Sequence, residues 1–219
     1  MPFARQLSAH QPAVSARRNG RRIVAWSATL ILVVGTLLAF SPVVSSADAL
    51  IAGENGGTGC TTVNRGAHRN VSFYYYDTLS SYVPALQNWS RTNNFGPTIL
   101  STTTDAKLDT QTDIIVRDGP YVGYCGFDWY NELDGGVLGL TQCDTVYSSG
   151  ACRQHTVRYS SIYMDGATTS QRRGLVCHES GHAIGLLHSS NSNSCMKPGD
   201  SSPAQNYDSS EVGQINAAY

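Results

Sequence analysis

The sequence predicts an α+β fold in which helices pack on one twisted, mixed β-sheet. Short segments rich in β-branched and aromatic residues alternate with longer segments that have helical spacing. Their order along the chain is a strand, a helix, four strands and a helix, and a capped helix follows near residue 219. This order favours a single sheet with helices packed against it.

The first predicted elements lie between residues 70 and 117. Residues 70–76 are aromatic and β-branched, which predicts a strand. Residues 80–91 carry apolar side chains at helical spacing, and Pro84 is tolerated there because it falls in the first turn. Residues 97–103 and 112–117 predict two further strands.

The remaining elements follow a glycine-rich stretch. Residues 137–140 form a short apolar run and residues 155–164 alternate in polarity, so each predicts a strand. Thr168 or Thr169 is a suitable first residue for the next helix. Residues 208–211 read as a capping box, which predicts the start of a final helix.

The first 49 residues have the features of a secretory signal peptide. An uncharged run at residues 23–40 follows Arg17, Arg18, Arg21 and Arg22, and a small-x-small pattern comes after it at residues 47–49. We therefore expect residues 1–49 to be removed and residues 50–219 to form one domain. The apolar run is also long enough for an uncleaved signal anchor, and the export route, general or twin-arginine, is left open.

The predicted mature domain is mildly acidic. Residues 50–219 contain 10 Lys and Arg against 15 Asp and Glu, which gives a net charge of −5. They contain no basic cluster. This balance argues against nucleic acid as a partner.

The chain has six cysteines, and all of them follow the predicted cleavage site. An even number of cysteines in an exported chain predicts three disulfides, although six cysteines permit 15 pairings. We expect one bridge across a short Ser-Ser-Gly loop, one that ties the motif helix to the turn beneath it, and one between the two that remain. The expected pairs are Cys143–Cys152, Cys177–Cys195 and Cys60–Cys125.

The run from residue 178 to residue 188 has the pattern H-E-x-x-H-x-x-G-x-x-H. His178 and His182 are one helical turn apart and can reach one metal ion, while Glu179 lies toward the open side of that ion. Gly185 can leave the helix in a left-handed conformation and so return His188 to the metal. Three histidines leave one position of a tetrahedral zinc open for water. A chance match to the full pattern arises in roughly one chain in 10⁵, so we favour the site over scattered surface histidines.

The motif resembles that of the metzincin clan of zinc endopeptidases. Met196 follows in the run Ser-Cys-Met-Lys-Pro-Gly, where it is similar to the methionine of the metzincin Met-turn. Ser189, directly after the third histidine, is similar to the serine found there in the matrixin family. The resemblance implies a metzincin-like zincin fold with a twisted mixed sheet, an active-site helix, a Met-turn and a C-terminal helix.

The resemblance also implies the activity and its partners. It assigns one catalytic Zn²⁺ to the three histidines and the role of general base to Glu179. It implies that protein or peptide substrates lie as extended strands along an edge strand, and that the enzyme acts as a secreted monomer without stable membrane association. The residues of the implied edge strand are Val137, Leu138, Gly139 and Leu140.

The chain departs from the matrixin pattern in two respects. Only His68 and His155 remain outside the motif in residues 50–219, so we expect no second, structural zinc. Cys60 does not have the sequence context of a cysteine-switch propeptide, and how latency is maintained is left open. A Ca²⁺ site at Asp118, Asp128 and Asp134 is a weaker hypothesis, because aspartates in turns commonly serve as caps.

Two other functions use the same residues. An exported, non-catalytic binding domain would keep zinc for stability, but such a domain has no need of Glu179. A cell-wall peptide amidase would share the zinc chemistry and differ in its pocket. The sequence does not separate the amidase from the endopeptidase.

Overall fold

The computed structural model describes residues 58–60, 64–76, 79–121, 123–126, 129, 137–199 and 204–219. All of these ranges fall in the compact unit Val44–Tyr219. The predicted signal peptide, its cleavage site, Asp128 and Asp134 lie outside the described residues. Within the described residues, no helix is long and apolar enough to cross a membrane.

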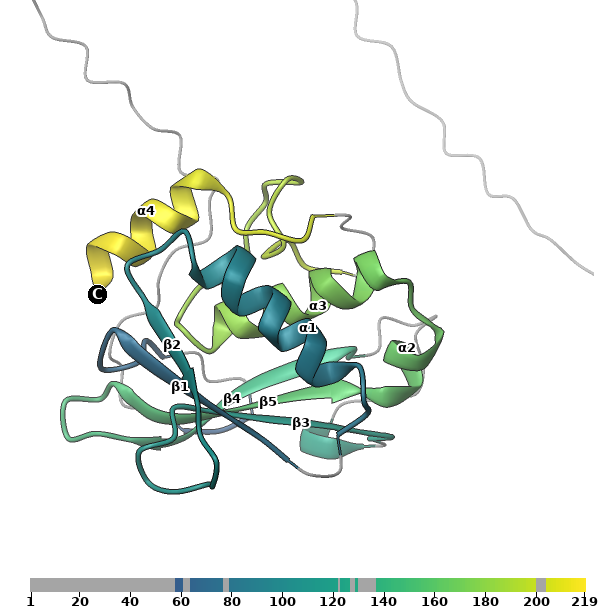
Figure 1. Ribbon diagram of the computed structural model, residues 1–219, viewed down its shortest axis with the longest axis horizontal. Coiled ribbons are helices and arrows are strands. Elements are labelled where there is room, and N and C mark those ends of the chain that lie inside the picture. The colour runs from purple at the N-terminus through teal and green to yellow at the C-terminus, as the bar shows by residue number, and fades with distance from the viewer. Residues whose placement is uncertain are drawn as a thin grey trace, which may run out of the picture. The chain divides into compact units, whose positions relative to one another are not determined.

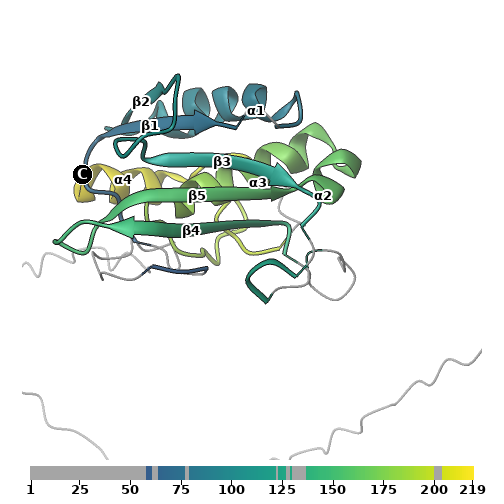
Figure 2. The same ribbon diagram turned by 90° about the horizontal axis from the view of Figure 1, so that it is seen from below.

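Five strands form one mixed sheet in the order β2-β1-β3-β5-β4 (Figure 2). The neighbouring pairs from β2 to β5 are parallel, and β4 runs antiparallel to β5 at the edge of the sheet. The prediction of a single mixed sheet is therefore confirmed. The strands are β1 (Asn70–Tyr75), β2 (Ser101–Thr104), β3 (Ile114–Gly119), β4 (Gly139–Val146) and β5 (Cys152–Ser160).

The strand boundaries differ from those predicted by up to six residues. The largest differences are at β2, which begins at Ser101 rather than at residue 97, and at β4 and β5. Pairing of β4 with β5 begins at Gly139, so Val137 and Leu138 precede the strand, and β4 continues to Val146. The predicted strand at residues 155–164 ends at Ser160, where a helix begins because the Ser160 side chain accepts a hydrogen bond from the Tyr163 N–H. Apolar residues continue across both boundaries, and apolarity reports burial rather than strand pairing.

Four α-helices are described, and α1, α3 and α4 lie on one side of the sheet (Figures 1 and 2). Pro84 occupies the first turn of α1, as expected, and a short π-helical turn continues from the end of that helix. The short α2 was not predicted, because its residues also alternate as a strand would. The helices are α1 (Val83–Ser90), α2 (Ser161–Gly166), α3 (Thr169–His182) and α4 (Ser209–Ala218).

Capping boxes define the starts of α3 and α4. Thr168 caps α3 and exchanges hydrogen bonds with Gln171, and Asp208 caps α4 and exchanges them with Glu211. Both starts agree with the prediction. The Thr168 box fixes the start of α3, whose last two turns carry His178, Glu179 and His182.

The core lies between the sheet and the helices. Phe73, Val157 and Tyr159 project from the strands and are fully buried against Val176 of α3 and Ile215 of α4, among others. Burial of a large apolar side chain contributes about 1.5–3 kcal/mol. This packing holds α3 against the sheet beside β4 and β5.

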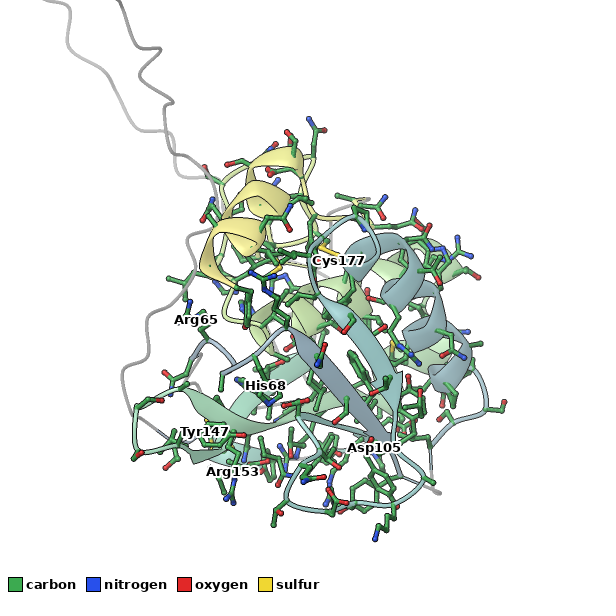
Figure 3. All side chains as sticks on the ribbon, turned by 60° about the vertical axis from the view of Figure 1, so that its left-hand side comes forward. Arg65, His68, Asp105, Tyr147, Arg153 and Cys177 are labelled. Atoms are coloured by element: carbon green, nitrogen blue, oxygen red, sulfur yellow. A yellow bond between two sulfur atoms is a disulfide. The ribbon has the colours of Figure 1, made fainter. Side chains whose placement is uncertain are left out.

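The three disulfides pair as predicted. Cys60 bonds Cys125, Cys143 bonds Cys152, and Cys177 bonds Cys195. Figure 3 shows Cys177 on α3 with its bond to the segment that precedes α4. Disulfides of this kind are compatible with an extracellular protein.

His155 gives the fold a predictable response to acid. It is fully buried on β5, where its Nε2 faces the carbonyl oxygen of Asn64 at 3.1 Å. Burial lowers the pKa of His155 to about 4, against the opposing effects of Asn64 and Asp144. The unfolded chain takes up this proton near pH 6.5, so His155 removes stability as the pH falls from about 6.5 to 4, by roughly 3 kcal/mol in total.

This effect is measurable by urea unfolding of the metal-free protein at pH 7.5 and pH 4, with chelator present throughout. We expect the free energy of unfolding of the parent to fall by roughly 3 kcal/mol more than that of His155→Gln. His68→Gln, which changes an exposed histidine, is the matched control and should keep the pH response of the parent. An equal pH response in parent and His155→Gln would contradict the prediction.

Candidate metal centre

The end of α3 brings the first two histidines of the motif together. His178 and His182 are four residues apart on one helix face, and their ring centroids are 4.6 Å apart. Gly181 lies between them on the buried side, where a Cβ would stand 2.3 Å from the sulfur of Met196. The helix can therefore pass directly over Met196 because residue 181 has no side chain.

Gly185 makes the turn that returns the third histidine. Its φ of +93° lies in the region that favours glycine, as the sequence predicts. A Cβ at this position would also approach the Cα of Arg65 to 3.0 Å. After the turn, the His188 ring lies 5.1 Å from that of His178 and 4.9 Å from that of His182, centroid to centroid.

Hydrogen bonds fix the tautomers of His178 and His182. The Nδ1 of His178 lies 2.8 Å from the carbonyl oxygen of Cys195, and the Nδ1 of His182 lies 2.6 Å from that of Leu186. A carbonyl oxygen only accepts, so each Nδ1 must carry the proton of its neutral ring. Each Nε2 is then an unprotonated lone pair.

These two lone pairs face each other, since the two Nε2 atoms are 3.1 Å apart. No hydrogen bond joins two acceptors, so the arrangement is repulsive unless a cation lies between them. Two imidazole nitrogens on one tetrahedral zinc are about 3.3 Å apart, as follows from Zn–N bonds of about 2.0–2.1 Å. One nitrogen of each of the three rings lies within 4.8 Å of the others. The donor set and spacing fit a zinc ion.

All three rings are suited to be neutral ligands. Burial lowers the pKa of His178 to about 4 and the pKa of His182 well below its usual value. Burial also lowers the pKa of His188, which is the most exposed of the three. Neutral imidazoles need not lose a proton before they bind a metal.

Glu179 is buried beside the three histidines, with 4% of its surface exposed. Burial raises the pKa of its carboxyl to about 8, and a hydrogen bond from the Thr141 hydroxyl acts in the opposite direction. A Cβ at Gly139 of β4 would stand 2.7 Å from Cγ of Glu179, so the strand and the helix touch at this point. A buried carboxyl without a cationic partner is typical of proton-transfer sites.

A network of hydrogen bonds holds the loop beneath the site. Met196 is fully buried, its N–H bonds the Ser194 hydroxyl, and its carbonyl oxygen accepts a bond from the N–H of Ser189. Ser194 in turn donates to a carboxylate oxygen of Glu211, at 2.5 Å. The loop that carries the Cys195 carbonyl is thus tied both to the residue after His188 and to α4.

A second group of metal-ligating residue types lies elsewhere, at Cys143, Cys152 and His155. The two cysteines are joined in a disulfide, so neither offers a thiolate. Asp118, one of the three proposed calcium ligands, accepts a hydrogen bond from the Ser80 N–H at 3.0 Å.

The predicted site residues His178, Glu179, His182, His188, Gly185 and Met196 are brought together. Sequence reasoning missed the residues that orient them: Thr141, Ser194 and Glu211, and the carbonyls of Leu186 and Cys195. No local signal marks a backbone carbonyl as a partner of a histidine. Glu211 did have a signal, because it belongs to the predicted capping box.

Comparison with known proteins adds no assignment. No model of a known protein family matches the chain, and no curated protein matches it significantly. The function must therefore be argued from the geometry of the site.

The Cys177–Cys195 disulfide is expected to affect metal binding. It ties α3 to the residue whose carbonyl orients the His178 ring. Loss of such a partner of a metal ligand typically lowers affinity 10- to 100-fold. Alanine at residue 195 keeps that carbonyl but removes its tether to α3, so we expect replacement of both cysteines by alanine to weaken zinc binding by up to roughly that factor.

Chelator competition measures this affinity directly. The matched control replaces Cys143 and Cys152 by alanine, which removes the disulfide that joins β4 to β5. Both double variants are expected to lose stability, by about 2–4 kcal/mol. Equal zinc affinity in the two variants would show that the Cys177–Cys195 bond has no particular role at the site.

Proposed function

We propose that the protein is a secreted zinc endopeptidase of the metzincin clan, most similar to the matrixins. The single observation that carries the proposal is the pair of unprotonated Nε2 atoms of His178 and His182, 3.1 Å apart, with His188 beside them. The order of the edge strand, motif helix, methionine loop and final helix also supports a metzincin-like zincin fold.

The residues of the site have distinct tasks in this proposal. The three imidazoles would hold zinc, which when bound supplies a Lewis acid that polarises a peptide carbonyl and makes water more acidic. The Glu179 carboxylate takes a proton from the attacking water and later releases it to the leaving amine. The carbonyls of Cys195 and Leu186 keep the His178 and His182 rings oriented throughout.

The outer edge of β4 is suited to pair with an extended peptide. The Cys143 carbonyl faces this edge, because it accepts a hydrogen bond from the Gly59 N–H at 3.2 Å. Backbone groups alternate in direction along an antiparallel strand, so the N–H and C=O groups of Gly139 and Thr141 also face outward. The Leu138 carbonyl faces inward, since it accepts from the Ser160 N–H.

A peptide paired with this edge would pass close to Glu179, because Gly139 touches that side chain. The sequence placed the substrate along residues 137–140. The geometry instead favours Gly139 and Thr141 as the residues that supply the pairing groups.

Two other functions remain candidates. A non-catalytic binding domain would gain nothing from burying Glu179, and burial of a carboxyl costs stability that one hydrogen bond from Thr141 does not fully offset. A cell-wall peptide amidase would have the same metal centre and proton acceptor. The two hydrolases differ in the bond that they cut.

Incubation of the folded, exported protein with a mixed peptide library tests the proposal, together with zinc analysis of the same preparation. We expect one zinc per chain and internal cleavage that stops with chelator and returns with zinc. Cleavage of cell-wall peptides alone would favour the amidase. A protein that binds zinc but cuts neither class of substrate would favour the binding domain.

A further inference from the structure

We propose that Thr141 is a positioning residue whose hydroxyl holds the Glu179 carboxyl both before and after that carboxyl takes up a proton. This inference rests on the proposed function. It adds to that function a residue on β4, outside the metal-binding motif.

The contact is buried and specific. The Thr141 Oγ1 lies 2.8 Å from a carboxylate oxygen of Glu179 and 2.8 Å from the backbone carbonyl oxygen of the same residue. The hydroxyl has one proton, so it donates to one of these two oxygens at a time. Thr141 is 3% exposed and Glu179 is 4% exposed, so water does not take the place of Glu179 as the partner of this hydroxyl. Thr141 faces α3 because it pairs with Val157, whose side chain belongs to the same core.

The two equal distances matter because a hydroxyl has one proton and also accepts hydrogen bonds. When Glu179 is a carboxylate, the Thr141 proton can point to it. When Glu179 has taken a proton, the carboxylic acid can donate to Oγ1, and the Thr141 proton can turn to the Glu179 carbonyl. The exchange is a rotation about one C–O bond, and no heavy atom has to move.

The Glu179 carbonyl does not depend on Thr141 for a partner. It also accepts the helical hydrogen bond from the Ala183 N–H, at 3.1 Å. A carbonyl oxygen has two lone pairs, so it tolerates gain or loss of the Thr141 bond. The Thr141 hydroxyl is therefore available to follow the proton of Glu179.

The test compares Thr141→Val, which keeps the shape and removes the hydroxyl, with Thr141→Ser, which keeps the hydroxyl. For Thr141→Val we expect kcat on a peptide substrate to fall roughly 10- to 100-fold, the range expected for a lost hydrogen bond to a charged group. We expect KM and zinc affinity to change by less than about threefold, and Thr141→Ser to restore most of kcat.

A second measurement does not require turnover. A peptide hydroxamate gives up a proton when it binds a metal, and Glu179 is the nearby acceptor. Calorimetry of the zinc-loaded protein should show weaker hydroxamate binding by Thr141→Val and near-parental binding by Thr141→Ser. Thr141→Ala serves in place of Thr141→Val if the latter does not fold.

Thr156→Val is the matched control. Thr156 is 2% exposed on the neighbouring strand, and its hydroxyl bonds the Asp144 carboxylate. We expect this variant to lose stability but to keep kcat. An unchanged kcat in Thr141→Val, or an equal loss in Thr141→Ser, would overturn the inference, whereas a parent without zinc or peptidase activity would overturn the proposed function instead.

Discussion

Glu179→Gln is expected to lower kcat/KM for peptide cleavage by roughly 10² to 10⁴, the usual contribution of a general base. The amide has the shape of the carboxyl and can keep a hydrogen bond with Thr141, but it cannot take a proton at neutral pH. His178 and His182 keep their hydrogen bonds to the carbonyls of Cys195 and Leu186, because neither bond involves the Glu179 side chain. Zinc content should therefore stay at the parental level.

Steady-state kinetics and metal analysis on one preparation check this result. The loss should appear in kcat, since a group that accepts a proton during the chemical step stabilises mainly the transition state. The matched control is Asp113→Asn, which changes a partly buried carboxylate whose hydrogen bond comes from the Ser72 N–H and which forms no part of the site. A fully active Glu179→Gln enzyme would exclude Glu179 as the base.

His182→Ala is expected to abolish both zinc binding and activity. His182 is the most deeply buried of the three candidate ligands, and its ring centroid lies 4.6 Å from that of His178 and 4.9 Å from that of His188. Two imidazoles, one of them exposed, are a poor zinc site. If zinc is present at about 1,000 times its Kd, its loss removes about 4 kcal/mol from the free energy of unfolding.

Thermal melting with and without added zinc measures this effect. The parent should melt at a higher temperature when zinc is added, and His182→Ala should not respond. His68→Ala, which changes an exposed histidine outside the centre, should respond like the parent. A zinc-dependent rise in the melting temperature of His182→Ala would place the metal elsewhere.

The sequence predicted well which residues come together in the candidate metal centre, because their geometry is local. His178 and His182 share a helix face, Gly185 requires a positive φ, and the capping boxes at Thr168 and Asp208 fix the helix starts. These relations extend over a few residues. The pairing of Cys177 with Cys195 could also be predicted, because the expected methionine loop lies under the helix.

The residues that orient the site could not be predicted in the same way. Thr141 meets Glu179 across 38 residues of sequence, and the contact exists only after β4 pairs with β5 and α3 packs on the sheet. The acceptors for the histidines are main-chain carbonyls, which no residue type identifies. The start of β4 was placed too early because Val137 and Leu138 are apolar without being paired.

Glu211 has a consequence for biosynthesis. One of its carboxylate oxygens accepts from the Asp208 N–H at the start of α4, and the other accepts from Ser194 in the loop beneath the histidines. The loop beneath the candidate metal centre is therefore held in place by a residue that leaves the ribosome more than twenty residues after His188. A nascent chain in which all three histidines have been synthesised still lacks the Glu211 contact that holds the loop beneath them. We therefore expect the site to reach its final geometry late in synthesis, when α4 docks.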